Sequence, residues 1–132
     1  MLIRNIFLFL LTGILLAACS KDDLAFDIIE SPVLVLFESQ GDAQPGMLKI
    51  KATFYDLDKS GILDHTVGID SIPVANLPVK IFVFENELVG EVTTDAQGSV
   101  IFEKDLTALQ GAGRLEWTGS YDDIPFRVYQ NY

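Results

Sequence analysis

Apolar and polar residues alternate along much of the chain after residue 32, and this two-residue period predicts β-strands. The clearest stretch is 47–57, where Leu48, Ile50, Ala52 and Phe54 would share one face and Lys49, Lys51 and Thr53 the other. Shorter runs rich in β-branched and aromatic residues indicate further strands. These are expected at 33–37, 79–84, 88–94, 99–103, 114–118 and 124–129.

Turn signals separate these runs, because five prolines and ten glycines punctuate the chain. Asp95-Ala96-Gln97-Gly98 is a compact turn, and it predicts a hairpin of strands 88–94 and 99–103. One short helical turn is expected within 104–113, but no window has a helical period of helix length. About seven short strands with regular turns predict an all-β, antiparallel β-sandwich of immunoglobulin-like type.

The first 19 residues differ from the rest, since 15 of them are hydrophobic and only Arg4 is charged. A basic residue, an apolar run over 6–16 and small residues before Cys19 form the three parts of a secretory signal peptide. At about 1.5 Å per residue this run is too short for a permanent span of a ~30 Å hydrocarbon core.

Leu16-Ala17-Ala18-Cys19 resembles the lipobox of bacterial lipoproteins. The resemblance implies that residues 1–18 are removed and that Cys19 carries a covalent lipid that anchors the chain to a membrane. Residues 19–31 would then form a polar tether and residues 32–132 the domain. The alternative is an ordinary signal peptide that happens to contain a cysteine. Cys19 is the only cysteine, so no disulfide stabilises the domain.

Ser20-Lys21-Asp22-Asp23 follows the lipobox directly. Serine at this place is compatible with sorting to the outer membrane, and the lysine with two acidic residues is similar to the export tag of some surface lipoproteins. A plain polar tether is the other interpretation. We therefore expect a lipid-anchored protein of the bacterial outer membrane, with the cell surface favoured over the periplasmic face.

The acidity lies entirely after the signal segment. The chain has a formal net charge of −10, and without Arg4 the rest has 8 basic and 19 acidic residues, 8 − 19 = −11. Nucleic-acid binding needs clustered lysine and arginine, and the sequence has no such stripe. We therefore expect no nucleic-acid partner.

The segment 56–64 has the spacing of the first nine positions of an EF-hand calcium loop, with oxygen side chains at 1, 3, 5 and 9 and glycine at 6. The candidate ligands are Asp56, Asp58, Ser60, Asp64 and the backbone carbonyl of Ile62. Position 12 is Val67 in place of the bidentate glutamate, so Asp70 would have to substitute. Strands flank the loop where an EF-hand has helices. The alternative is a solvated acidic turn without Ca²⁺.

Three segments, 55–64 (YDLDKSGILD), 77–81 (LPVKI) and 93–102 (TTDAQGSVIF), resemble the B-type repeat of serine–aspartate-repeat adhesins. Collagen-adhesin B domains and other prealbumin-like modules are related to it. The resemblance spans about Phe54 to Phe102, and the connection between Asp64 and Leu77 is longer than in the usual repeat. It implies an immunoglobulin-like, prealbumin-like sandwich, a structural calcium loop and a structural or adhesive role without catalysis.

Other candidate residues receive simpler interpretations. The only histidine, His65, has no partner for a catalytic triad or a zinc site and is expected on a surface loop. Trp117 and Phe126 are expected in the core. Tyr129 and Tyr132 are candidates for a contact surface, with a protein partner favoured and carbohydrate as a second option.

Three functions follow from these observations. The favoured one is a non-enzymatic, lipid-anchored immunoglobulin-like module with an adhesive, accessory or assembly role. The alternative is a periplasm-facing lipoprotein subunit of an envelope or secretion machine. A hydrolase is the weakest, because the sequence has no nucleophile motif.

Overall fold

A computed structural model describes residues 30–40 and 44–132. These residues form eight β-strands and one 3₁₀ turn, and all strand pairs are antiparallel. The elements are β1 (Leu34–Ser39), β2 (Met47–Asp58), β3 (Asp70–Pro73), β4 (Pro78–Val83), β5 (Glu87–Thr93), β6 (Ser99–Asp105), η1 (Leu106–Leu109), β7 (Arg114–Tyr121) and β8 (Ile124–Asn131).

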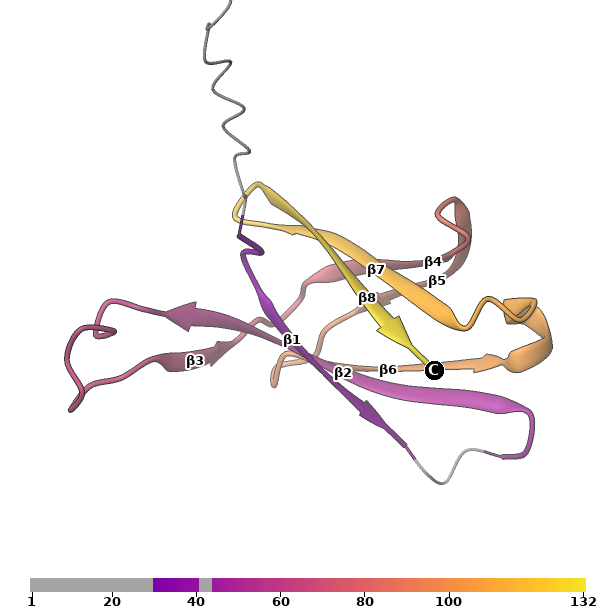
Figure 1. The fold of residues 1–132 in the computed structure, drawn as a ribbon, viewed down its shortest axis with the longest axis horizontal. Helices are drawn as coiled ribbons and strands as arrows, with labels where there is room; N and C mark the ends of the chain where they lie inside the picture. Colours follow the sequence, from indigo (N-terminus) through magenta and orange to yellow (C-terminus); the bar gives the residue numbers. More distant parts are fainter. Residues whose placement is uncertain (1–29, 41–43) are drawn as a thin grey trace, which may run out of the picture.

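The strands form two four-stranded sheets that pack face to face (Figure 1). In the first sheet, β1 pairs with one edge of β2, and β6 and β3 pair with its other edge. The second sheet has the order β5-β4-β7-β8. The predicted all-β immunoglobulin-like sandwich is therefore confirmed, with eight strands where about seven were expected.

The core lies between the sheets and follows the alternation of the strands. Ile50, Ala52 and Phe54 of β2 point inward, as their spacing predicted, and each is at most 1% exposed. Trp117 of β7 is fully buried between Phe37 and Phe102, with ring centroids 5.3 and 5.8 Å away. Burial of such side chains contributes about 1.5–3 kcal/mol each, so this layer stabilises the sandwich.

Two strand glycines make room for core aromatic rings. A Cβ on Gly90 would lie 2.7 Å from the Phe102 ring, and one on Gly119 would lie 2.6 Å from the Phe126 ring. Real Cβ atoms do not approach so closely, so these positions need glycine for packing. Phe126 itself is buried, as the sequence predicted.

β2 changes partner at Phe54. The Phe54 N–H donates to the carbonyl of Gly98 (2.8 Å), and the Phe54 carbonyl accepts from the Val74 N–H (3.0 Å). Before this residue β2 pairs with β6, and after it with β3. Gly98 has a φ of +71°, and a Cβ there would lie 2.6 Å from the Phe54 carbonyl oxygen, so the junction requires glycine.

The predicted hairpin of strands 88–94 and 99–103 is wrong. β5 pairs with β4 in the second sheet, and β6 pairs with β2 in the first. The turn does form, because the Asp95 carboxylate accepts from the N–H groups of Gln97 and Ser99 (both 2.9 Å). It connects the two sheets, and Val89 of β5 and Phe102 of β6 are both buried in the core between them.

The buried Thr94 holds this connection in place. Its hydroxyl donates to the Val74 carbonyl (2.6 Å) and accepts from the Leu77 N–H (2.9 Å). Thr94 thereby ties the end of β5 to the segment between β3 and β4. Over the ranges 30–40 and 44–132, no helix is both long and apolar enough to cross a membrane.

Candidate functional site

The hairpin of β2 and β3 projects from one end of the sandwich (Figure 1). Its strands pair from Tyr55–Pro73 to Asp58–Asp70, and the loop 59–69 joins them. A turn at its tip is closed by N–H groups of Val67 and Gly68, which both donate to the Asp64 carbonyl (3.1 and 3.0 Å). We call residues 55–73 the projecting hairpin.

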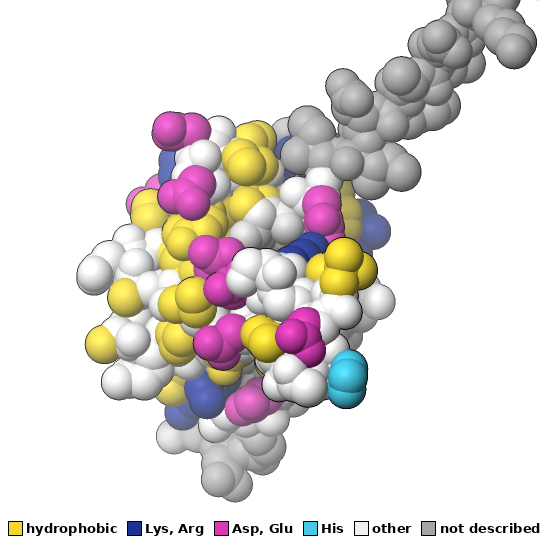
Figure 2. Space-filling view, turned by 90° about the vertical axis from the view of Figure 1, so that its left-hand side faces the viewer, with side chains coloured by type: hydrophobic (Ala, Val, Ile, Leu, Met, Phe, Trp, Pro, Cys, Tyr) yellow, Lys and Arg dark blue, Asp and Glu magenta, His cyan; other side chains and the backbone are white. Residues whose placement is uncertain are grey.

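The end of the projecting hairpin is apolar and open to solvent. Leu63 is 99% exposed and Val67 is 68% exposed, although both are large hydrophobic residues. Figure 2 views the molecule from this side and shows hydrophobic side chains interspersed with acidic ones. We call the exposed hydrophobic residues of this hairpin the apolar tip: Ile62, Leu63, Val67, Ile69 and Ile72.

Exposed apolar residues gathered on one projecting element make the apolar tip a candidate interaction surface. The sequence reasoning assigned Ile62 only a carbonyl role and gave none to Leu63, Val67 or Ile69. The signal was present, because these apolar residues lie in a segment that has neither a strand period nor a helix period.

The six predicted calcium ligands lie on the projecting hairpin but do not share one centre. Asp56 accepts a hydrogen bond from the Tyr121 hydroxyl (3.1 Å), and Asp64 accepts from the N–H and hydroxyl of Thr66 (2.9 and 2.6 Å). Asp70 accepts from the Ser71 N–H (2.9 Å), while Ile62 is exposed. Each carboxylate therefore already caps a local polar group.

Three of the predicted ligands lie nearer to one another. Asp58 and Asp70 are opposite each other in the ladder, and with Ser60 they line a shallow hollow of about 390 Å³. Within the described residues, no three His, Cys, Asp or Glu side chains are grouped to hold a metal ion. The full ligand set does not fit one Ca²⁺ shell in this arrangement, and calcium binding stays a prediction.

Local hydrogen bonds stabilise the charged form of two loop carboxylates. Ser60 holds the pKa of Asp58 below its ordinary value through its side chain and its N–H, and Thr66 does the same for Asp64. Both carboxylates therefore stay ionised at neutral pH. Lys59, the one cation of the segment, forms an ion pair with Glu30. The apolar tip thus lies on a hairpin of net negative charge.

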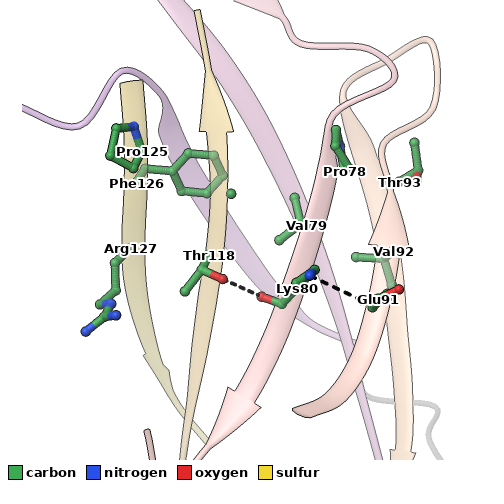
Figure 3. Close-up of a pocket in the computed structure, with 11 residues that line it drawn as sticks. Pro78, Val79, Lys80, Glu91, Val92, Thr93, Thr118, Pro125, Phe126 and Arg127 are labelled. Atoms are coloured by element: carbon green, nitrogen blue, oxygen red, sulfur yellow. Dashed lines mark hydrogen bonds and ion pairs between the residues drawn. The ribbon is translucent and has the colours of Figure 1, made fainter. Parts of the chain in front are cut away.

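A second candidate surface is a groove of about 810 Å³ on the second sheet (Figure 3). Pro78 and Thr93 line one side, and Pro125 and Phe126 line the other. Lys80 and Glu91 form an ion pair in it (3.7 Å), and the Thr118 hydroxyl donates to the Lys80 carbonyl (3.4 Å). The groove is open to solvent, and its charged lining residues are Lys80, Glu91 and Arg127.

The two predicted contact tyrosines lie three residues apart in sequence and have different surroundings. Tyr129 is 47% exposed, and the Arg114 guanidinium lies 4.4 Å from its ring centre. The Tyr132 hydroxyl accepts from the Gly113 N–H (3.2 Å). Next to Tyr129, Glu116 is buried and its carboxylate pairs with Arg127 Nε (2.8 Å). These residues form one polar and aromatic surface on the second sheet.

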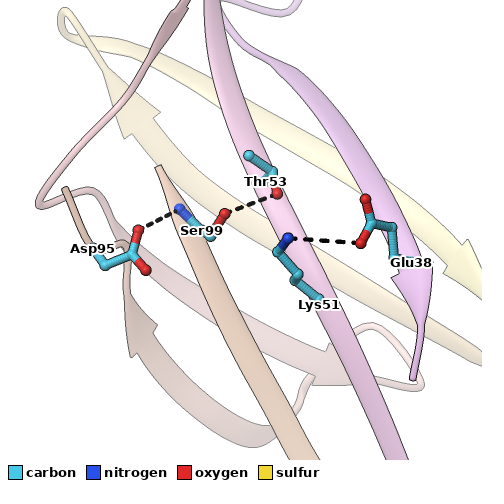
Figure 4. A network of polar contacts seen from close by, with 5 residues as sticks. All are labelled: Glu38, Lys51, Thr53, Asp95 and Ser99. Atoms are coloured by element: carbon cyan, nitrogen blue, oxygen red, sulfur yellow. Dashed lines mark hydrogen bonds and ion pairs between the residues drawn. The ribbon is translucent and has the colours of Figure 1, made fainter. Parts of the chain in front are cut away.

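The outer face of the first sheet has a strip of polar contacts (Figure 4). Lys51 pairs with Glu38 (3.6 Å), and the Thr53 and Ser99 hydroxyls lie 3.0 Å apart. Ser99 also donates from its N–H to Asp95. Each of these groups has a polar partner, so none of them points to a ligand.

Comparison with family models, curated proteins and solved structures gives no significant match to the chain. The predicted lipidation site, Cys19, lies outside the described residues. His65 is on the loop surface, as expected. The projecting hairpin is therefore the leading candidate site, because its projection and its exposed apolar residues are both seen in the structure.

Proposed function

We propose that this chain is a non-enzymatic, lipid-anchored interaction module of the bacterial outer membrane with an adhesive, accessory or assembly role. The lipid on Cys19 would hold the sandwich at the membrane, and residues 19–31 would separate the two. The favoured location is the cell surface. The observation that supports an interaction role is the apolar tip, because Leu63 is 99% exposed on a hairpin outside the core.

The chemistry of the hairpin indicates the kind of partner. Asp58, Asp64 and Asp70 lie on the same hairpin as the apolar tip, and Lys59 is already paired with Glu30. A protein partner with an apolar pocket and a rim of lysine or arginine would complement both features. Carbohydrate, by contrast, would favour aromatic platforms such as Tyr129 over aliphatic side chains.

Site-specific photocrosslinking from residue 63 in the full-length, membrane-anchored protein tests this role. We expect a protein adduct from position 63 that decreases at high salt, because the acidic rim contributes to binding. The matched control is position 36, where an exposed leucine lies on β1, far from the tip in sequence. Equal adducts from both positions, or none from position 63, would contradict the proposal.

The alternative is a periplasm-facing subunit of an envelope or secretion machine, in which the apolar tip contacts a larger assembly. The two proposals differ in where the anchored domain is exposed. Protease added to intact cells should digest the domain if it is on the surface. Complete protection, with digestion after the outer membrane is permeabilised, would support the periplasmic alternative.

Calcium binding by the loop is tested separately. Binding to the folded state alone would raise stability by RT ln(1 + [Ca²⁺]/Kd). Thermal melts with Ca²⁺ and with chelator should then separate. The Asp58→Asn variant, which lacks one ligand, should show a smaller separation. If the curves of the unsubstituted chain with Ca²⁺ and with chelator coincide, the calcium site is ruled out and the interaction proposal is unaffected.

A further inference from the structure

β8 is an edge strand with an open side. It is the last strand of the second sheet and pairs only with β7 among the described strands. The turn before it has two residues, Asp122 and Asp123, both with positive φ, so Tyr121 and Ile124 form the hydrogen-bonded pair that closes the hairpin. At its other end, the Tyr132 N–H donates to the Gly113 carbonyl (3.2 Å).

These two ends establish which backbone groups are free. Alternate residues of an antiparallel strand direct both N–H and C=O to the same neighbour. Ile124 and Tyr132 are bonded to β7, so the even-numbered residues of β8 face β7 and the odd-numbered residues face the open edge. The only proline of β8, Pro125, is odd-numbered, and its missing N–H therefore costs the β7 ladder nothing.

The open edge has a balanced set of hydrogen-bonding groups. Its donors are the N–H groups of Arg127, Tyr129 and Asn131. Its acceptors would be four carbonyls, but the Asn131 carbonyl already accepts from its neighbour Gln130 through Nε2 (2.8 Å). The carbonyls of Pro125, Arg127 and Tyr129 are left, so three donors match three acceptors.

We propose that β8 pairs with β8 of a second copy of this chain, antiparallel and about a twofold axis at Val128. The two second sheets would then form one continuous eight-stranded sheet. In this register Arg127 lies opposite Tyr129 of the second copy, and Pro125 lies opposite Asn131. All six N–H donors of the two edges meet a carbonyl.

The hydrogen-bonding groups and charges of the edge favour this register over the two registers that are shifted to either side of it. The carbonyl opposite the missing N–H of Pro125 is that of Asn131, which Gln130 already satisfies. A shift in one direction would place Arg127 opposite itself, which like charges disfavour. A shift in the other direction would place Tyr129 opposite itself and leave Pro125 without a partner. Only the register centred on Val128 uses every free group.

The other edges are less suited to this pairing. β5 has an irregular register between Ile81 and Phe82 of its neighbour, and bulges protect edges. β3 has only four residues, and β1 has six. β6, which pairs only with β2 among the described strands, has seven residues and ends in the charged residues Glu103, Lys104 and Asp105. Charged side chains also protect edges, but the single charge of β8, on Arg127, is paired with the buried Glu116. β8 is thus the longest edge without an effective block.

A cysteine scan in membranes tests the interface and its register. Val128 would form a non-hydrogen-bonded pair with its own copy, with Cα atoms about 4.5 Å apart, which a disulfide can span. We expect mild oxidation of full-length Val128→Cys to give a covalent dimer. The unsubstituted chain measures any dimer formed through Cys19, and Leu36→Cys measures pairing through β1. If Leu36→Cys gives as much covalent dimer as Val128→Cys, or if Val128→Cys gives none, the proposal is overturned.

Sedimentation of the full-length protein in detergent gives a second test. Tyr129→Pro removes an N–H that faces the open edge, so it eliminates two of the six hydrogen bonds and leaves the β7 ladder intact. We expect the dimer Kd to rise about tenfold or more, while Tyr129→Phe, which keeps the ring near Arg114, has little effect. Circular dichroism shows whether both variants fold.

The salt dependence of the dimer fraction gives a third test, which uses the unsubstituted chain alone. Each copy has a net charge of −10, so the two copies repel and added salt should increase the dimer fraction. If the protein sediments as a monomer at protein concentrations up to about 100 µM and at every salt concentration, the proposal is overturned. This holds both for an edge that is solvated and for one that is covered by residues of its own chain. Leu63→Asp should leave the dimer unchanged, so this result is independent of the proposed role of the apolar tip.

Discussion

The sandwich body and the projecting hairpin share a strand, β2, yet apolar side chains are buried in the body and exposed on the hairpin. Inside the body, Phe54 of β2 is fully buried against the second sheet. Beyond it, Ile72 of β3 is about half exposed, although it lies on the same side of the sheet, opposite Asp56. The hairpin extends past the second sheet (Figure 1), which meets only its base, where Tyr121 of β7 bonds to Asp56. Burial of an apolar side chain in this molecule therefore depends on whether the opposing sheet covers it.

Truncation of a leucine should separate the two regions most strongly. Leu115 of β7 is fully buried, so Leu115→Ala should lower the free energy of unfolding by about 2–5 kcal/mol. Leu63→Ala should change it by less than about 0.5 kcal/mol, since Leu63 has almost no contacts to lose. Urea titration followed by circular dichroism measures both. A large loss in Leu63→Ala would show that the tip packs against the body.

Glycine substitution should give the next largest difference. Gly98 and Gly68 both have a φ of +71°, which costs an L-residue roughly 1–2 kcal/mol. Gly98→Ala should cost clearly more, because its Cβ would also lie 2.6 Å from the Phe54 carbonyl oxygen. Gly68 has nothing within 4 Å, so Gly68→Ala should show the backbone cost alone. Equal losses in the two thermal melts would mean that the β2 junction can relax.

Threonine-to-valine changes should give a smaller contrast. Thr94→Val removes a buried hydroxyl that donates to Val74 and accepts from Leu77, so we expect a loss of about 1–3 kcal/mol. Thr66→Val removes an exposed hydroxyl on the hairpin, whose partner Asp64 can bond to water. Its effect should be within about 0.5 kcal/mol. Denaturant titration of both variants gives the comparison, and the reverse order would refute it.

Tyr121 joins the two regions and should give the smallest effect, visible only at alkaline pH. Burial and then the hydrogen bond to Asp56 raise its pKa above the ordinary value. The folded state therefore keeps this proton longer, so its stabilisation is full below pH about 10 and is lost as the pH rises through the raised pKa. Melting temperatures of the unsubstituted chain should fall more steeply above pH about 10 than those of Tyr121→Phe. Parallel curves would contradict the shift.

The strand pattern was readable from the sequence because one face of each strand is buried. The alternation at 47–57 predicted β2 and its inward residues, and the aromatic residues Trp117 and Phe126 were correctly placed in the core. The pairing of 88–94 with 99–103 was not readable. Asp95 and Gly98 define a turn, but a turn does not say whether the chain stays in one sheet or crosses to the other.

The candidate site was only partly predictable for a related reason. The spacing of Asp56, Asp58 and Asp64 matched a calcium loop, but the structure engages each carboxylate with a nearby hydroxyl or N–H group. Sequence spacing gives the interval between residues with side-chain oxygens, but it does not give the direction in which each side chain points. The exposure of Leu63 likewise depends on how far the hairpin extends past the second sheet.

The sequence by itself determined the strand class, the acidic domain and the positions of the core residues, because local period and composition set these. The tertiary structure decided three further features. These were the crossing at Asp95–Gly98, the uncovered hairpin and the open edge of β8. Each depends on which strands lie next to or opposite one another, and such contacts join residues far apart in the chain.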